Sequence, residues 1–371
     1  MFDRIKAFYA QADVNTSRQD NVDLAKVFAI AFMILIHLMM YPEYQSLQTT
    51  FGWIADSFLG GFMAAPVFMF AMGVGLAFSR NNDSGKIIKR GVKIFLLNYL
   101  LNVARSISIL VSLGLEKADT LEYSLNLFSG DILSFAGLAM ISFGLLKKLK
   151  HANIIIPVVG IACNLVVGCF RGIFCNNATI CLVAGLFVPV GYGDTGEVFS
   201  YFPLLTWFVI VGIGYVFGLT VRKIRNLDNF YTWSIFAGAL VLAVTMTLEL
   251  TLNFGQLMCD NDFSGYRKLP IDVLLELGFV FLEFGCFHFL TKKSSQKLRN
   301  FIFTVSDAVN EIYIISWILI LDVWYALYLF IFKGNHPDGY AIQWYLLGFA
   351  IITAISIRLA ISWKKSKRRH P

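Results

Sequence analysis

The chain has 371 residues, a net charge of +7 and 57% hydrophobic residues. Only 15% of its residues are charged, whereas soluble domains carry roughly 25%. This composition excludes a soluble domain and predicts an all-α integral membrane protein. The positive charge falls in short clusters between apolar runs. That distribution favours contact with acidic lipid headgroups over nucleic-acid binding, and no nucleic-acid partner is expected.

Apolar segments taken in chain order predict about ten membrane-spanning helices. The predicted spans are 22–41, 58–79, 92–114, 131–147, 153–174, 203–221, 230–252, 270–290, 304–332 and 340–363. The span at 304–332 exceeds the roughly 20 residues needed to cross a bilayer, so it is expected to tilt or to extend beyond the membrane. The segment 178–190 is apolar but short. We expect a re-entrant or interfacial piece there, with an eleven-span protein as the alternative.

Basic residues gather in every second loop, and this asymmetry orients the predicted helices. Clusters follow the second, fourth, sixth and eighth spans and end the chain, at 80–93, 147–150, 222–225, 292–299 and 364–369. Cytoplasmic loops carry the excess of Lys and Arg, so both termini are expected in the cytoplasm. The resulting organisation is a cytoplasmic segment at 1–21, one transmembrane domain at 22–363 and a basic cytoplasmic tail at 364–371. A multi-pass protein of the plasma membrane is our default expectation.

The six cysteines form no CxxC pair, so we predict no zinc site and no resident metal. Cys175, Cys181 and Cys259 fall on the expected outer side, where a disulfide is possible. The sequence leaves their pairing open, as it leaves open the oligomeric state.

The first span carries the clearest set of polar residues. Asp23 and Lys26 are three apart near its start, and His37 lies eleven residues beyond Lys26. Eleven residues make close to three helical turns, which places Lys26 and His37 on one face, roughly 16 Å apart along the axis. A cation near the cytoplasm is suited to a phosphate, and a deeper imidazole is suited to a general base or an acyl-accepting nucleophile. The alternative is a lysine that extends to the headgroups and a packed histidine.

A second polar group lies on the third and fourth spans. Asn98, Asn102 and Arg105 recur at i, i+4 and i+7, which forms a stripe on one face of a helix. Such a stripe either lines a hydrophilic path or joins helices through hydrogen bonds. Asp131 opens the fourth span.

Acidic residues also occur within later spans, where each is costly and is therefore a functional candidate. Asp272, Glu276 and Glu283 share one face of the eighth span. For Asp272 we favour an interfacial position. Asp322 lies deep in the ninth span and is less readily explained as a structural residue.

Several motifs together resemble the transmembrane acyltransferase superfamily, which includes the acyltransferase-3 and the heparan-α-glucosaminide N-acetyltransferase-like proteins. Asp23-Leu24-Ala25-Lys26, followed after ten residues by His37, resembles the family signature "D-x-x-R, ten residues, H". Further resemblances, in matching order, lie at 66–80, Lys89-Arg90, 130–141, 201–218 and 306–320. The chain departs from the family pattern at Lys26, where Arg is usual, and at Thr206, where Pro is usual. Lysine keeps the charge of arginine but loses its bidentate geometry.

The resemblance implies transfer of an acyl group, usually acetyl, from cytoplasmic acyl-CoA to a hydroxyl or amine of a cell-surface or envelope carbohydrate. By that analogy His37 is the catalytic residue, and Lys26, Lys89 and Arg90 bind the CoA phosphates. Asp23, Arg105 and Asp131 then support the site or line the acceptor path. Acyl-CoA is a co-substrate, and no permanently bound cofactor is expected. The alternatives are a small-molecule transporter or exporter and a non-catalytic relative of the family.

Overall fold

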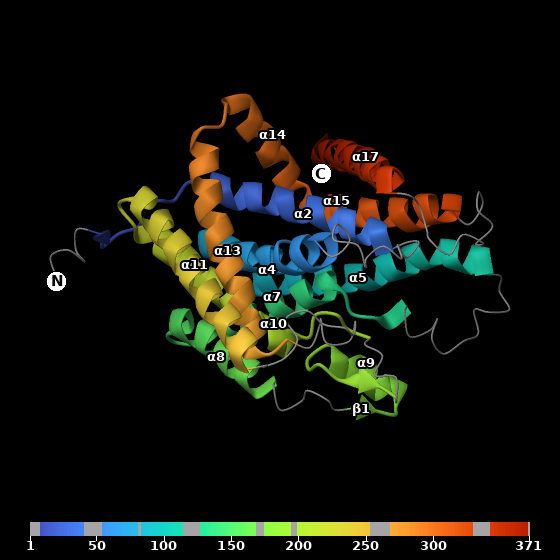
Figure 1. The fold of residues 1–371 in the computed structure, drawn as a ribbon, viewed down its shortest axis with the longest axis horizontal. Coiled ribbons are helices and arrows are strands. Elements are labelled where there is room, and N and C mark those ends of the chain that lie inside the picture. Colours follow the sequence, from blue (N-terminus) through green and yellow to red (C-terminus); the bar gives the residue numbers. More distant parts are fainter. Residues whose placement is uncertain are drawn as a thin grey trace. The chain divides into compact units, whose positions relative to one another are not determined.

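The structure is a computed structural model that describes residues 8–40, 54–80, 83–113, 127–167, 174–193, 199–252, 268–328 and 342–369. Helices dominate these residues, as the composition predicts (Figure 1). The chain separates into two compact units. Unit 1 comprises Met1–Val22, Pro66–Leu100 and Phe128–Lys292, and unit 2 comprises Asp23–Ala65, Leu101–Leu127 and Lys293–Pro371.

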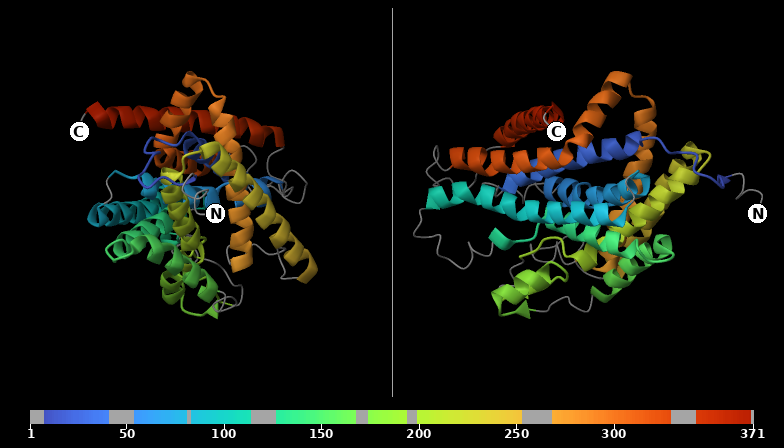
Figure 2. Two further views of the ribbon diagram at one scale, coloured as in Figure 1. Left: turned by 90° about the vertical axis from the view of Figure 1, so that its left-hand side faces the viewer. Right: turned by 180° about the vertical axis from the view of Figure 1, so that it is seen from behind.

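Unit 1 is a bundle of apolar helices. It contains most of α4 (Ala65–Phe78), the first part of α5 (Ser84–Leu113), and the whole of α7 (Ile132–Leu146), α8 (Ala152–Val167), α10 (Leu204–Lys223), α11 (Leu227–Leu252) and α13 (Pro270–Lys292). Two pairs pack along their lengths, α8 with α10 and α11 with α13 (Figure 2). α10 supplies much of the core, because Trp207, Phe208, Ile210 and Val211 are all buried.

Glycines allow α4 and α10 of unit 1 to cross in backbone contact. A Cβ on Gly73 of α4 would lie 2.2 Å from the Val211 carbonyl oxygen of α10, and a Cβ on Gly214 of α10 would lie 2.3 Å from the Phe70 carbonyl oxygen. Small residues let membrane helices approach to backbone contact, and such packing replaces the hydrophobic force that lipid does not provide. Residues 72–78, with the sequence MGVGLAF, therefore contain a packing motif centred on Gly73.

A two-stranded sheet and a short helix lie between α8 and α10 in unit 1. β1 (Phe174–Cys175) pairs in parallel with β2 (Gly191–Tyr192), and α9 (Ala178–Gly185) lies between them. Asn177 caps α9 by accepting a hydrogen bond from the Ile180 N–H. An eight-residue helix is only about 12 Å long, so α9 is too short to cross a bilayer core of about 30 Å by itself.

Unit 2 contains nearly all of α2 (Asp20–Met40), together with the π-helical η2 (Ile54–Phe62), α14 (Gln296–Asp307), α15 (Val309–Ile318), the π-helical η5 (Leu319–Tyr325) and α17 (Ile342–Arg369). α17 packs on α15 and η5, and it crosses α15 (Figure 2). A Cβ on Gly348 of α17 would lie 2.7 Å from the Trp324 ring. This close packing holds η5 against α17.

Among the described residues, seven helices are long and apolar enough to cross a membrane, by length and composition. α7 and α8 are shorter apolar helices. The prediction of a single helix at 304–332 is wrong, because Ala308 ends α14 and begins α15, and η5 then follows as a wider turn. The predicted boundary at residue 363 does not end the last helix either, since α17 continues through the basic tail to Arg369.

The Gly73 contact predicts a loss of stability on substitution. Gly73→Ala should destabilise the protein by about 1–3 kcal/mol, the usual cost of overpacking, because its methyl group would collide with α10 backbone. The measurement is the midpoint of thermal denaturation in detergent. Gly75→Ala on the same helix is the matched control, since a Cβ there meets nothing within 4 Å. Equal midpoints for the two variants would contradict the packing account.

Candidate functional site

Asp23 and Lys26 form the first part of the site, at one end of α2. The Lys26 Nζ lies 4.0 Å from the Asp23 Oδ1. The hydroxyl of Ser306, at the end of α14, donates a hydrogen bond to the same carboxylate oxygen. Asp23 is 4% exposed, whereas the Lys26 side chain is 27% exposed. The buried carboxylate therefore positions a lysine whose side chain is partly exposed.

His37 forms the second part of the site, farther along α2. Its ring stacks on the Trp317 ring of α15, with centroids 4.0 Å apart and an interplanar angle of 27°. Tyr313 approaches the imidazole edge-on at 6.2 Å. The Arg105 guanidinium carbon also lies over the Trp317 ring, 4.9 Å from its centroid. Trp317 therefore fixes the plane of the imidazole and brings a cation into its neighbourhood.

One unbroken helix carries both parts, as the sequence predicts. Eleven residues separate Lys26 from His37, so the two side chains share a face at a spacing of about 16 Å. The structure also brings Arg105 to the His37 cluster through Trp317. The sequence singled out Arg105 but gave no signal for this contact, since Trp317 lies more than two hundred residues farther along the chain.

Lys364 adds a basic group, although the sequence predicted that it belongs to the basic cytoplasmic tail. Its Nζ lies 3.5 Å from the Glu311 Oε2 and donates a hydrogen bond to the carbonyl oxygen of Asp307, the neighbour of Ser306. Lys364 therefore lies at the same end of unit 2 as Asp23 and Lys26. Beside it lies an open groove of about 600 Å³, formed mainly by α17. The groove is lined by Ile315, Leu359, Ser362, Trp363, Ser366 and Lys367.

The remaining predicted site residues belong to unit 1. Lys89 and Arg90 are exposed near the start of α5. Asp131 is buried and caps α7, because its Oδ1 accepts a hydrogen bond of 2.7 Å from the Ile132 N–H. The cap accounts for a carboxylate at this position. The structure thus gives Asp131 a structural contact, and its role on an acceptor path stays a prediction.

The asparagines of the predicted stripe join segments through hydrogen bonds. The Asn98 Nδ2 donates to the Ser129 carbonyl oxygen, and the Asn102 Nδ2 donates to the Leu127 carbonyl oxygen, each at 3.0 Å. Both side chains are 1% exposed. Of the two interpretations, helix joining therefore describes the asparagines, while Arg105 belongs to the His37 cluster.

Two acids are buried along one face of α13 in unit 1. Glu276 is paired with the Lys268 ammonium, 3.3 Å from its Oε1. Glu283, two turns farther on, is 4% exposed, and neither of its carboxyl oxygens has a hydrogen-bond partner among the described residues. The ion pair with Lys268 accounts for the burial of the Glu276 carboxyl group. No contact among the described residues accounts for the burial of the Glu283 carboxyl group.

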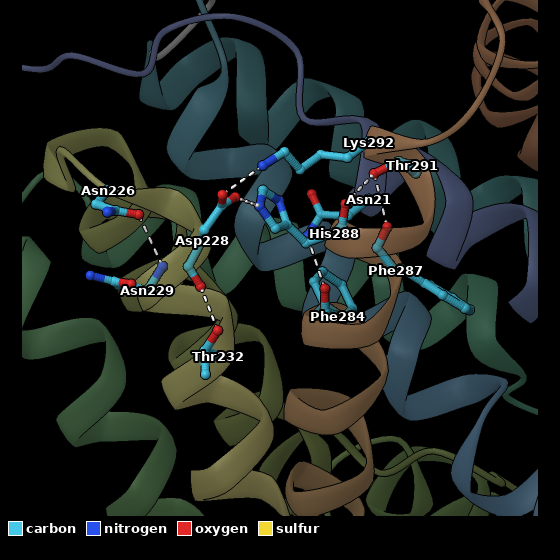
Figure 3. A network of polar contacts seen from close by, with 10 residues as sticks. All are labelled: Asn21, Asn226, Asp228, Asn229, Thr232, Phe284, Phe287, His288, Thr291 and Lys292. Atoms are coloured by element: carbon cyan, nitrogen blue, oxygen red, sulfur yellow. Dashed lines mark hydrogen bonds and ion pairs between the residues drawn. The ribbon is translucent and has the colours of Figure 1, made fainter.

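A polar network joins α11 to the end of α13 (Figure 3). The Asp228 carboxylate contacts both the His288 Nε2, at 2.8 Å, and the Lys292 Nζ, at 2.6 Å. The His288 ring stacks on Tyr231, with centroids 4.3 Å apart. Asn21 donates a hydrogen bond to the Phe284 carbonyl oxygen beside this network. His288 and Lys292 therefore form, with Asp228, a clamp that fastens the ends of α11 and α13.

Cys175 and Cys181 are free thiols, and Cys259 lies outside the described residues. Burial raises the pKa of the Cys181 thiol to about 12, and contact with Cys175 adds to the rise. This thiol is therefore protonated at neutral pH. Within the part of the chain that the structure describes, no group of three or more His, Cys, Asp or Glu residues forms a metal-binding cluster.

The apolar helices define a multi-pass membrane protein, and the polar clusters along α2 form its candidate site. Residues 18–254, more than half of the chain, match the family described as heparan-alpha-glucosaminide N-acetyltransferase, catalytic. The chain belongs to this family of membrane acetyltransferases. No curated protein and no solved structure matches the chain. The matched segment contains Asp23, Lys26, His37 and Arg105, whereas α13 to α17 lie beyond it.

The hydrogen bond from Ser306 to Asp23 predicts a measurable contribution to stability. Ser306→Ala should lower the free energy of unfolding by about 1.5–3 kcal/mol, because a buried carboxylate loses a charge-assisted hydrogen bond. Thermal denaturation in detergent measures the effect. Ser316→Ala is the control, since Ser316 donates only to the Tyr313 carbonyl oxygen of its own helix. A Ser306→Ala variant as stable as this control would contradict the assigned contact.

Proposed function

We propose that the protein transfers an acyl group, in the first instance acetyl, from cytoplasmic acyl-CoA to a hydroxyl or amine of an envelope or cell-surface carbohydrate. The observation that carries the proposal is the stacking of His37, which lies within the segment that matches the acetyltransferase family, on the ring of Trp317. The proposal includes the orientation inferred from the basic loops, with the Lys26 end of α2 at the cytoplasm. It also includes a plasma-membrane location.

His37 is the proposed general base. It accepts the proton of the acceptor hydroxyl or amine as the acceptor oxygen or nitrogen bonds to the thioester carbonyl carbon. The C–S bond then breaks, and the imidazolium returns the proton to the departing CoA thiolate. The ring ends in its starting state, so no net proton is left on the protein. Stacking on Trp317 supports this role, since a general base must hold its nitrogen within hydrogen-bond reach of the proton that it takes.

Lys26 is the proposed anchor for the CoA phosphates. Its side chain is partly exposed, and Asp23 holds it in position. The separation of about 16 Å between Lys26 and His37 is of the order that the extended pantetheine arm of CoA covers between phosphate and thioester. Lys89 and Arg90 are proposed to add positive charge for the same phosphates. Asp23 acts as a positioning residue, and Arg105 stabilises negative charge near the imidazole.

A transporter or exporter of small molecules is the second candidate, because polar helices also line transport paths. Transporters often show an inverted repeat with interrupted helices, and the sequence shows no such repeat. The family match favours the enzyme. A non-catalytic relative is the third candidate, and the Lys26 departure from the family pattern is the observation that favours it.

The test is acetyl-CoA turnover by purified protein in detergent or liposomes. We expect slow hydrolysis or transfer by the wild type, and at least a hundredfold loss in His37→Ala, the usual contribution of a general base. His288→Ala is the matched control, because His288 binds Asp228 in the clamp between α11 and α13. Loss of turnover in the control alone, or no acetyl-CoA binding by folded wild-type protein, would contradict the proposal.

A further inference from the structure

Asp322 is a carboxylate in the membrane-embedded part of unit 2 that the proposed reaction does not yet use. Its Oδ1 is buried and has no hydrogen-bond partner among the described residues. It lies in η5, which continues α15 as a π-helix. Acids are costly within a membrane helix and commonly mark a site, and π-helical turns occur frequently at functional sites. The family match ends at residue 254 and assigns nothing to this position.

Contacts of α2 place Asp322 relative to the proposed catalytic residue. Asp23 meets Ser306, and farther along α2 His37 meets Tyr313 and Trp317. α2 and the chain from α14 through α15 therefore run in the same direction. Asp322 follows Trp317 by five residues, at most about 7.5 Å along the helix axis. It lies beyond His37 on the side away from Lys26, which is the side from which the acceptor would approach.

Packing on α17 fixes the helical turn that carries Asp322. η5 begins at Leu319, two residues after Trp317, and a π-helix closes its hydrogen bonds between residues five apart. The neighbouring Trp324 packs on Gly348 of α17, and its ring lies 6.0 Å from that of Tyr345. η5, and Asp322 with it, is thereby fixed against α17.

We propose that Asp322 binds the acyl acceptor by accepting a hydrogen bond from a hydroxyl or ammonium group beside the reacting atom. This inference rests on the proposed function and adds the residue that selects the acceptor. A buried acceptor atom that lacks a donor carries a desolvation cost, and a polar acceptor molecule removes that cost. The charge of the Asp322 side chain determines whether it binds an ammonium or a hydroxyl more strongly. A carboxylate attracts an ammonium much more strongly than it attracts a neutral hydroxyl.

The experiment measures initial rates of acetyl transfer from acetyl-CoA to two probes, glucosamine and glucose, by purified protein in liposomes. The variants are Asp322→Asn and Asp322→Ala. Asparagine keeps a carbonyl oxygen but removes the charge, so Asp322→Asn should raise the KM for glucosamine at least tenfold and that for glucose less than threefold. Asp322→Ala should raise both at least tenfold. The KM for acetyl-CoA should stay within twofold of the wild-type value in both variants.

Glu311→Gln is the matched control, because Glu311 is an acid of the adjoining α15 whose carboxylate is already paired with Lys364. It should leave the KM for both sugars within twofold of wild type. Unchanged sugar KM values in Asp322→Ala would overturn the assignment, as would a parallel rise in the KM for acetyl-CoA. If the wild-type protein turns over acetyl-CoA but neither sugar accelerates the reaction, the acceptor site at Asp322 would be overturned and the proposed use of acetyl-CoA would stand. Wild-type protein without any acetyl-CoA turnover would overturn the proposed function as well.

Discussion

The cost of placing charged groups inside a bilayer governs the arrangement of α2. A carboxylate or an ammonium group in hydrocarbon is stable only when it is paired, hydrogen-bonded or next to water. Asp23 meets this requirement through Lys26 and Ser306, and Glu276 meets it through Lys268. His37 is suited to the deeper position because an imidazole can be neutral near physiological pH. The pairing of Asp23 with Lys26 and Ser306 thus accounts for charged groups near the start of α2.

Close helix packing provides the rigidity that such a site requires. Gly73 and Gly214 bring α4 and α10 into backbone contact in unit 1, and Gly348 accommodates Trp324 in unit 2. Aromatic rings provide the finer positioning, since Trp317 contacts both His37 and Arg105. A catalytic group must be held close to its productive geometry by neighbours whose own positions are fixed. Here the supporting residues come from α14, α15 and α17, beyond the segment that the family match covers.

The sequence predicted those features that depend on periodicity and composition. It identified the apolar helices, the common face of Lys26 and His37, and the family. The predicted single helix at 304–332 was wrong because the apolar run contains no residue pattern that indicates the break at Ala308 or the π-helical turn of η5. The sequence alone also did not predict contacts between segments that are far apart in the chain. Trp317 beside His37 and Lys364 beside Asp307 depend on packing, and the structure shows Asp131 as a helix cap, which the sequence did not predict.

The central claim is that donor and acceptor meet His37 from opposite ends of α2, so that the acyl group crosses the bilayer. The direct measurement uses liposomes with uniformly oriented protein, glucosamine trapped inside and radiolabelled acetyl-CoA added outside, on the side of the basic loops. The account predicts labelled acetylated glucosamine inside the vesicles, and none with His37→Ala protein. Labelled sugar that forms only when glucosamine and acetyl-CoA share one compartment would contradict it.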